Sequence, residues 1–120
     1  MDELVGRIAA NVGISRLVAE KAVGIILEFL AREAPPDTVR ELTGRLPGSE
    51  AAIETARSEG GTFVGLGGVM GVGTRLMGLG LGMPEIQRVT REFIAFAREQ
   101  AGDEAVGRFM DAIPGLRQFI

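Results

Sequence analysis

The side chains that most often carry catalysis are missing from this sequence. The chain of 120 residues contains neither cysteine nor histidine. It therefore has no thiol nucleophile, no zinc ligands of the usual kind and no group that ordinarily titrates near neutral pH. Pairs of carboxylates remain, at Glu92 and Glu99 and at Asp103 and Glu104, but helix surfaces and helix caps normally carry acids at such positions. We predict a protein that is not an enzyme and that uses neither a metal nor a cofactor.

Two glycine patterns match phosphate-binding motifs only in part. Gly68 and Gly73 have the spacing of a phosphate loop, but Thr74 stands where that loop requires lysine. The segment Gly65-Leu66-Gly67 lacks the later glycine of a dinucleotide-binding motif, and no predicted strand precedes it. Neither pattern predicts a nucleotide site.

The charge balance argues against nucleic acid as a partner. The sequence has 13 basic and 16 acidic residues, a formal net charge of -3, so there is no basic excess to neutralise phosphates. The chain begins Met1-Asp2-Glu3, without the basic and apolar regions of a secretory signal. We expect a cytoplasmic protein.

The most unusual feature is a glycine-rich apolar segment at residues 60–82. It contains ten of the eighteen glycines, and valine, leucine, methionine and phenylalanine stand between them, unlike a polar flexible linker. It could form a buried loop or loose helix, and its small-residue spacing would also allow tight packing between copies. Its length suits a membrane span, but Arg75 opposes insertion by about 3 kcal/mol. The predicted interaction surface comprises Phe63, Gly67, Gly71, Arg75, Leu76, Met77, Leu79 and Leu81.

Apolar periodicity predicts an all-α fold. Ser15, Asp37 and Asp103 are placed to cap helices, and Glu41 and Arg45 have the order of a favourable ion pair one turn apart. The predicted helices cover residues 2–13, 15–34, 37–46, 49–56, 84–101 and 103–113.

The two halves of the chain align without a gap when the sequence is shifted by 67 positions. Ile26 then meets Phe93, Leu42 meets Phe109, and a Pro-Gly pair closes both halves. Because the agreement runs through two helices and the loop between them, we favour a true repeat over a chance match of amphipathic helices. We predict one domain, residues 1–120, with a repeat unit at 2–53, a linker at 54–68 and a second unit at 69–120. The counterpart of the first helix then falls at residues 69–79, where each glycine weakens a helix by up to about 1 kcal/mol.

Several of these features are shared with a known family. Gly13-Ile14-Ser15, the apolar stripe from Ala22 to Leu30, and helix ends at Leu46-Pro47 and Ile113-Pro114 make the chain similar to an uncharacterised bacterial family of duplicated helical units, domain of unknown function 2267. That family has no established activity, so the resemblance implies a fold and no functional residues. The glycine-rich segment departs from the family's usual pattern.

The first two predicted helices also resemble the start of histone-like bacterial DNA-binding proteins. In that family this portion forms the dimer, whereas basic β-arms hold the DNA. No such arms are present in this sequence, so the likeness implies helical dimerisation without DNA binding.

These observations lead to three functional expectations. The first is a non-enzymatic protein that self-associates or binds a protein partner through residues 63–81. The alternative is a peripheral membrane protein that uses the same segment. A third is a protein that binds a small apolar ligand between its two halves.

Overall fold

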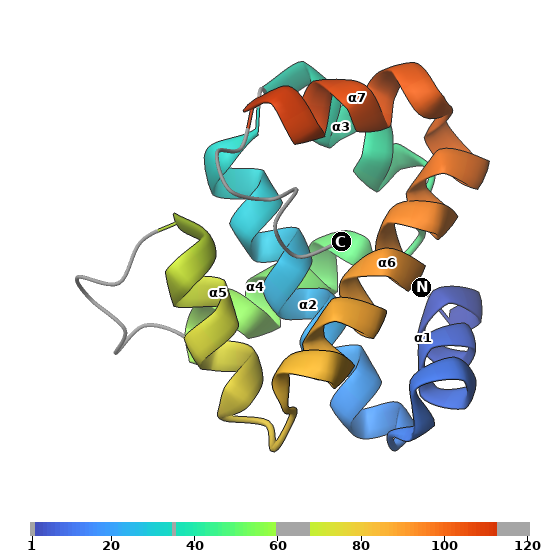
Figure 1. The fold of residues 1–120 in the computed structure, drawn as a ribbon. Coiled ribbons are helices and arrows are strands. Elements are labelled where there is room, and N and C mark those ends of the chain that lie inside the picture. Colours follow the sequence, from blue (N-terminus) through green and yellow to red (C-terminus); the bar gives the residue numbers. More distant parts are fainter. Residues whose placement is uncertain (1, 35, 60–67, 113–120) are drawn as a thin grey trace.

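The protein is helical throughout the part that the computed structural model describes, residues 2–34, 36–59 and 68–112. Within these ranges the chain forms seven α-helices, one π-helical turn and no strand (Figure 1). The predicted all-α class is confirmed. The elements are α1 (Asp2–Ile8), the π-turn η1 (Ala9–Gly13), α2 (Arg16–Glu33), α3 (Pro36–Gly44), α4 (Ser49–Glu59), α5 (Gly68–Met77), α6 (Met83–Ala101) and α7 (Asp103–Ala112).

Local sequence signals explain where the two longest helices begin. The backbone of Ser15 is extended, and its Oγ accepts a hydrogen bond of 3.2 Å from the amide of Val18, which caps α2 as predicted. Pro84 lies in the first turn of α6, where its missing N–H costs nothing. Gly13 and Gly80, which precede these starts, have φ angles of 83° and 90°. Residues with a Cβ rarely adopt such angles, so glycine is needed at both turns.

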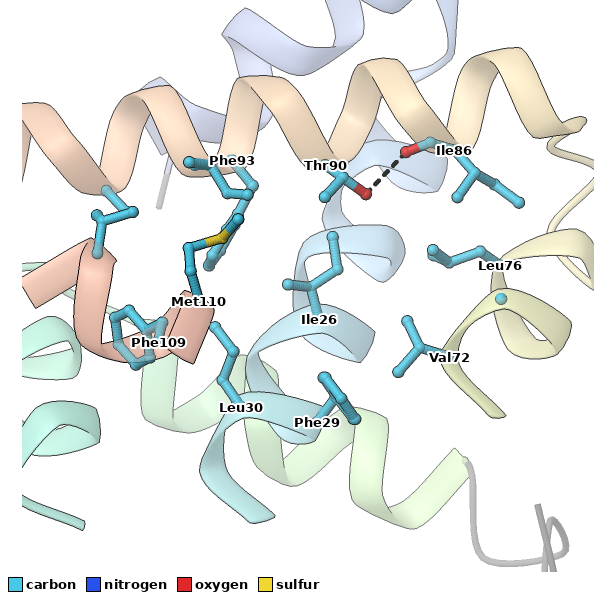
Figure 2. A pocket seen from close by; sticks show the side chains of 14 residues that line it. Ile26, Phe29, Leu30, Val72, Leu76, Ile86, Thr90, Phe93, Phe109 and Met110 are labelled. Atoms are coloured by element: carbon cyan, nitrogen blue, oxygen red, sulfur yellow. Dashed lines mark hydrogen bonds between the residues drawn. The ribbon is translucent and has the colours of Figure 1, made fainter. Parts of the chain in front are cut away.

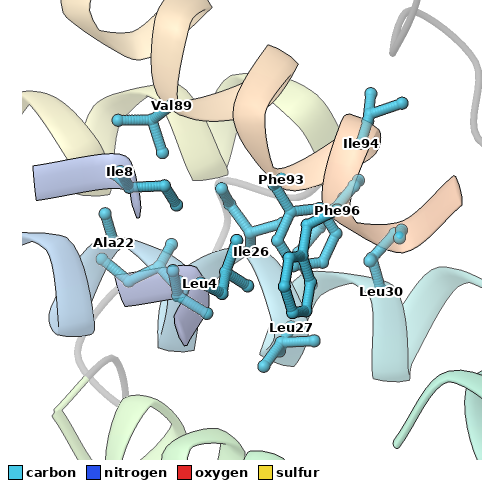
Figure 3. Packing of buried hydrophobic residues seen from close by; sticks show 14 of the residues in the cluster. Leu4, Ile8, Ala22, Ile26, Leu27, Leu30, Val89, Phe93, Ile94 and Phe96 are labelled. Carbon is cyan, nitrogen blue, oxygen red and sulfur yellow. The ribbon is translucent and has the colours of Figure 1, made fainter. Parts of the chain in front are cut away.

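The core lies around α2 and α6. Every residue from Ala22 to Leu30 is buried, because α1, α4, α5 and α6 all contact α2. Figure 3 shows Leu4 and Ile8 of α1 packed among side chains of α2 and α6. Both are completely buried, and burial of each contributes about 1.5–3 kcal/mol. The core therefore joins segments from both ends of the sequence.

The helices recur with the spacing predicted for a repeat. α6 begins 67 positions after α2, α7 begins 67 positions after α3, and Gly80 follows Gly13 by the same interval. The first helix of each half contacts the long helix of the other half, because α1 packs against α6 and α5 packs against α2. Glu41 and Arg108 occupy equivalent positions in the alignment, and their side chains form an ion pair of 3.0 Å. Common descent of the two halves stays a prediction.

The glycine-rich segment contains a helix, α5. The predicted linker, residues 54–68, is not a continuous linker, because α4 extends to Glu59 and α5 begins at Gly68. The predicted ion pair between Glu41 and Arg45 is also wrong. Glu41 pairs with Arg108, and Arg45 donates a hydrogen bond to the backbone oxygen of Gln100, because α6 and α7 pack against α3 and supply closer partners.

None of the helices in the described ranges combines the length and the hydrophobicity needed to cross a membrane.

Candidate functional site

An apolar cavity lies between α2 and the three helices of the second half (Figure 2). About 40 Å³ inside it is open to the centre of a water-sized sphere. One water molecule needs about 10–15 Å³ on this scale, so the space exceeds that of a single water. The side chains that enclose it come from α2 (Ile26, Phe29, Leu30), α5 (Val72, Leu76), α6 (Ile86, Thr90, Phe93, Ile94, Ala97) and α7 (Val106, Phe109, Met110), together with the backbone of Gly73.

The cavity wall offers almost no hydrogen-bonding capacity. Among the described lining residues Thr90 is the one polar side chain. Its Oγ1 donates a hydrogen bond of 2.8 Å to the backbone oxygen of Ile86 one turn earlier in α6 (Figure 2). A polar molecule entering this space would lose its hydrogen bonds to water without replacing them. The cavity therefore suits an apolar group.

α1 and α5 differ in the side chains that they bring to the core. In the 67-position alignment Leu4 corresponds to Gly71 and Ile8 corresponds to Arg75. Leu4 and Ile8 fill the angle between α2 and α6 on one side of the core (Figure 3). On the α5 side, Gly71 contributes no side chain and Arg75 binds polar groups instead. α5 therefore brings neither of these two large apolar side chains to the core, although Leu76 is buried where the alignment places Ala9 of η1.

Arg75 joins α5 to α2 and α4. Its Nη1 lies 3.3 Å from Oε2 of Glu28, and its Nη2 donates a hydrogen bond of 2.6 Å to the backbone oxygen of Ala56. Nε of Arg32 lies 3.0 Å from the other oxygen of Glu28. The side chains of Arg75 and Glu28 are only 10% and 6% exposed, so this is a buried charge pair.

The sequence contained a signal for this pair that the prediction missed. The sequence-based expectations give Arg75 two roles, as a cost to membrane insertion and as part of the predicted interaction surface. They assign it no acidic partner. Glu28 is a single acid within the continuous apolar run from Ala22 to Leu30. A carboxylate is rarely buried unless it is paired, so its position calls for a basic partner from another helix.

The remaining residues of the predicted interaction surface mostly face inward. Gly71, Leu76 and Leu81 are buried and Leu79 is partly buried, whereas Met77 is 51% exposed. Phe63 and Gly67 lie outside the described residues. The structure thus places Leu76 in the cavity wall, Arg75 between α5, α2 and α4, and Met77 at the surface. A contact role for this segment stays a prediction.

Of the carboxylates considered for catalysis, Glu92, Glu99 and Asp103 have structural partners. Arg7 of α1 forms ion pairs with Glu92, at 3.1 Å, and with Glu99 of α6. The hydrogen bond to Glu99 is the main cause that raises the pKa of Arg7, and the bond to Glu92 adds to it against the opposing effect of desolvation. Asp103 lies 3.6 Å from Arg98. In the described part of the chain, no acidic residues gather in a group that could hold a metal ion.

Comparison with known families, with curated proteins and with solved structures gives no match. The resemblances inferred from sequence motifs therefore stay expectations. The function of the cavity therefore has to be inferred from the chemistry of its lining and of the neighbouring Arg75.

A second, wider hollow lies between α1, α2 and α4. Its lining mixes acids such as Glu3 and Glu20 with the bases Arg16 and Lys21. Charges of both signs at an open surface are well hydrated and favour no particular ligand. The apolar cavity beside α5 is therefore the stronger candidate site.

Proposed function

We propose that this protein is a non-enzymatic, cytoplasmic binding protein that holds a small apolar molecule between its two helical halves. The observation that carries the proposal is the cavity itself. Side chains from both halves line it, and the hydroxyl of its polar residue Thr90 already donates to the backbone. Binding sites for small molecules are typically concave and mostly apolar.

The lining also indicates the shape of the ligand. Phe29, Phe93 and Phe109 present aromatic surfaces, and Met110 adds a polarisable thioether. Aromatic rings pack favourably against other rings and against methionine sulfur. The chemistry of this lining suits a single aromatic ring or a short hydrocarbon. The free volume of about 40 Å³ is smaller than the roughly 150 Å³ of an apolar cavity that holds benzene, so the surrounding helices have to move apart to admit even one ring.

Fluorobenzene provides a direct test, because its fluorine resonance reports binding to the protein. We expect saturable binding with a dissociation constant on the order of 1 mM or lower, which corresponds to about -4 kcal/mol or better. Ala97→Leu places an isopropyl group into the cavity and should abolish this binding. Ala95→Leu adds the same group on the same helix, at a partly buried position outside the cavity lining, and should leave binding intact. A folded wild-type protein that does not bind, or equal binding by both variants, would contradict the proposal.

Self-association through the α5 region is the second candidate function. Three large apolar side chains are exposed in the described residues: Leu17 at 63%, Met77 at 51% and Met83 at 46%. They stand at the start of α2, the end of α5 and the start of α6, and these helix ends all lie toward the lower edge of Figure 1. Exposed apolar side chains of this size would suit contact with a second copy of the chain or with a membrane surface.

Light scattering after size exclusion tests this candidate. A mass that rises with concentration, and that returns to the monomer value in Met77→Glu, would support self-association. A monomeric wild-type protein would exclude it. Co-flotation of the monomer with liposomes would instead support the peripheral membrane alternative.

A further inference from the structure

Among the helices that line the cavity, α5 has the sequence with the lowest intrinsic helix propensity. Val72, Gly73 and Leu76 line the cavity, and Gly68, Gly71 and Gly73 all lie within this ten-residue helix. Glycine lowers helix stability because it loses more backbone freedom on ordering than other residues. A helix this short is marginal without tertiary contacts. α5 therefore depends on its attachment to α2, α4 and α6.

Arg75 makes polar contacts that belong to this attachment. Arg75 contacts Glu28 on α2 and donates to the backbone oxygen of Ala56 on α4. Ala56 lies in the last turn of α4, where helix carbonyl groups turn to partners outside the helix. The guanidinium thus satisfies both a buried carboxylate and a helix terminus.

The same arrangement allows Arg75 to separate from Glu28 without leaving a buried charge unpaired. Glu28 is also paired with Arg32 on its own helix, so its carboxylate keeps a cationic partner when α5 moves away. Arg75 would be hydrated on release. Breaking a buried ion pair is most costly when it leaves an uncompensated charge. Because Glu28 stays paired with Arg32, its carboxylate is not left uncompensated.

We propose that α5 is the door of the cavity and that Arg75 is its latch. The contacts of Arg75 with Glu28 and Ala56 hold α5 in place, and separation of α5 from α2 widens the space so that an apolar ligand can enter and leave. The role in ligand entry rests on the proposed function, whereas the opening of α5 does not.

Hydrogen exchange of the full chain tests the latch without any ligand. Arg75→Met keeps an unbranched apolar stem and removes both polar contacts. We expect the amides of residues 71–77 to exchange at least tenfold faster, with the amides of α6 unchanged. Arg7→Met is the matched control, because Arg7 joins α1 to α6 in the other half, and it should accelerate α1 and not α5. Unchanged exchange in α5, or equal acceleration of all helices, would overturn the latch.

Ligand kinetics then test the door. With fluorobenzene as the probe, we expect Arg75→Met to raise the association and dissociation rates together by at least fivefold while the dissociation constant changes less than threefold. Faster exchange in α5 with unchanged ligand rates would overturn its role as the door. Absence of fluorobenzene binding by the wild-type protein would overturn the proposed function and the door with it, and the exchange data would still decide the latch. If Arg75→Met does not fold, Arg75→Lys, which keeps the charge, should give a smaller acceleration confined to α5.

Discussion

A buried ionic side chain stabilises a protein only when its partners replace the hydration it has lost. Arg75 meets this condition through two acceptors on different helices, Glu28 and the Ala56 carbonyl. Arg7 makes a comparable connection between α1 and α6, but its side chain is 32% exposed, so solvent screens its ion pairs. Each arginine connects the first helix of one half to the long helix of the other half. Their ion pairs therefore contribute differently to the free energy of unfolding, because only those of Arg7 are screened by solvent.

The buried ion pair of Arg75 with Glu28 leads to a specific prediction for stability. Glu28→Met removes the carboxylate and leaves Arg75 buried without a counter-charge, which should lower the free energy of unfolding by about 3–5 kcal/mol. The double variant Glu28→Met with Arg75→Met should be more stable than the sum of the single effects predicts, by at least about 1 kcal/mol. Urea unfolding of the four proteins measures this coupling. Additive effects would show that Arg75 and Glu28 contribute independently.

At the scale of helices, local patterns predicted the elements that lie in a conventional environment. The apolar stripes of α2, α6 and α7 follow from their own sequences, and Ser15 caps α2 as expected. Asp37 and Asp103 were also predicted as caps, but they lie within the first turns of α3 and α7. α5 could not be predicted firmly as a helix, because its glycines disfavour one and the contacts that compensate come from α2 and α6. The ion pair of Glu41 with Arg108 was missed for the same reason. Sequence spacing describes neighbours along one helix and says nothing about neighbours across a tertiary contact.

The contact between α2 and α4 makes a matched pair of glycine substitutions informative. A Cβ at Gly24 would lie 3.1 Å from the backbone oxygen of Ala52, whereas a Cβ at Gly107 in α7 would meet nothing within 4 Å. Alanine is the better helix former by about 0.5–1 kcal/mol. Gly107→Ala should therefore raise stability by about that amount. Gly24→Ala should lower it by about 1 kcal/mol or more, because a backbone oxygen cannot move aside easily.

Thermal and urea unfolding of the two variants check this prediction. A stabilising Gly24→Ala would mean that α2 and α4 are less closely packed than the structure describes. A destabilising Gly107→Ala would mean that another contact limits space at α7.

At the scale of the whole molecule, the arrangement of the halves was easier to anticipate than the site between them. The 67-position alignment predicted two similar units, and binding between them was one of three expectations. The cavity itself was not predictable, because its lining comes from four helices, α2, α5, α6 and α7. Whether a void remains where four helices meet depends on how far they close around it. That response is a property of the packed core and cannot be inferred from one helix.

The exchange of contacts between the halves predicts that neither half folds alone. Leu4 and Ile8 of α1 are completely buried among residues that include Val89 and Phe93 of α6 (Figure 3), so a fragment of residues 1–59 would expose them. A chain of that length is also marginal for independent folding. Circular dichroism should show little helix and no cooperative thermal transition for fragments 1–59 and 60–120 separately. An equimolar mixture should recover both, because α1 then finds α6 and α5 finds α2. Cooperative unfolding of either fragment alone would show that its half has a self-sufficient core, and the apolar cavity would then lie at an interface between independent units.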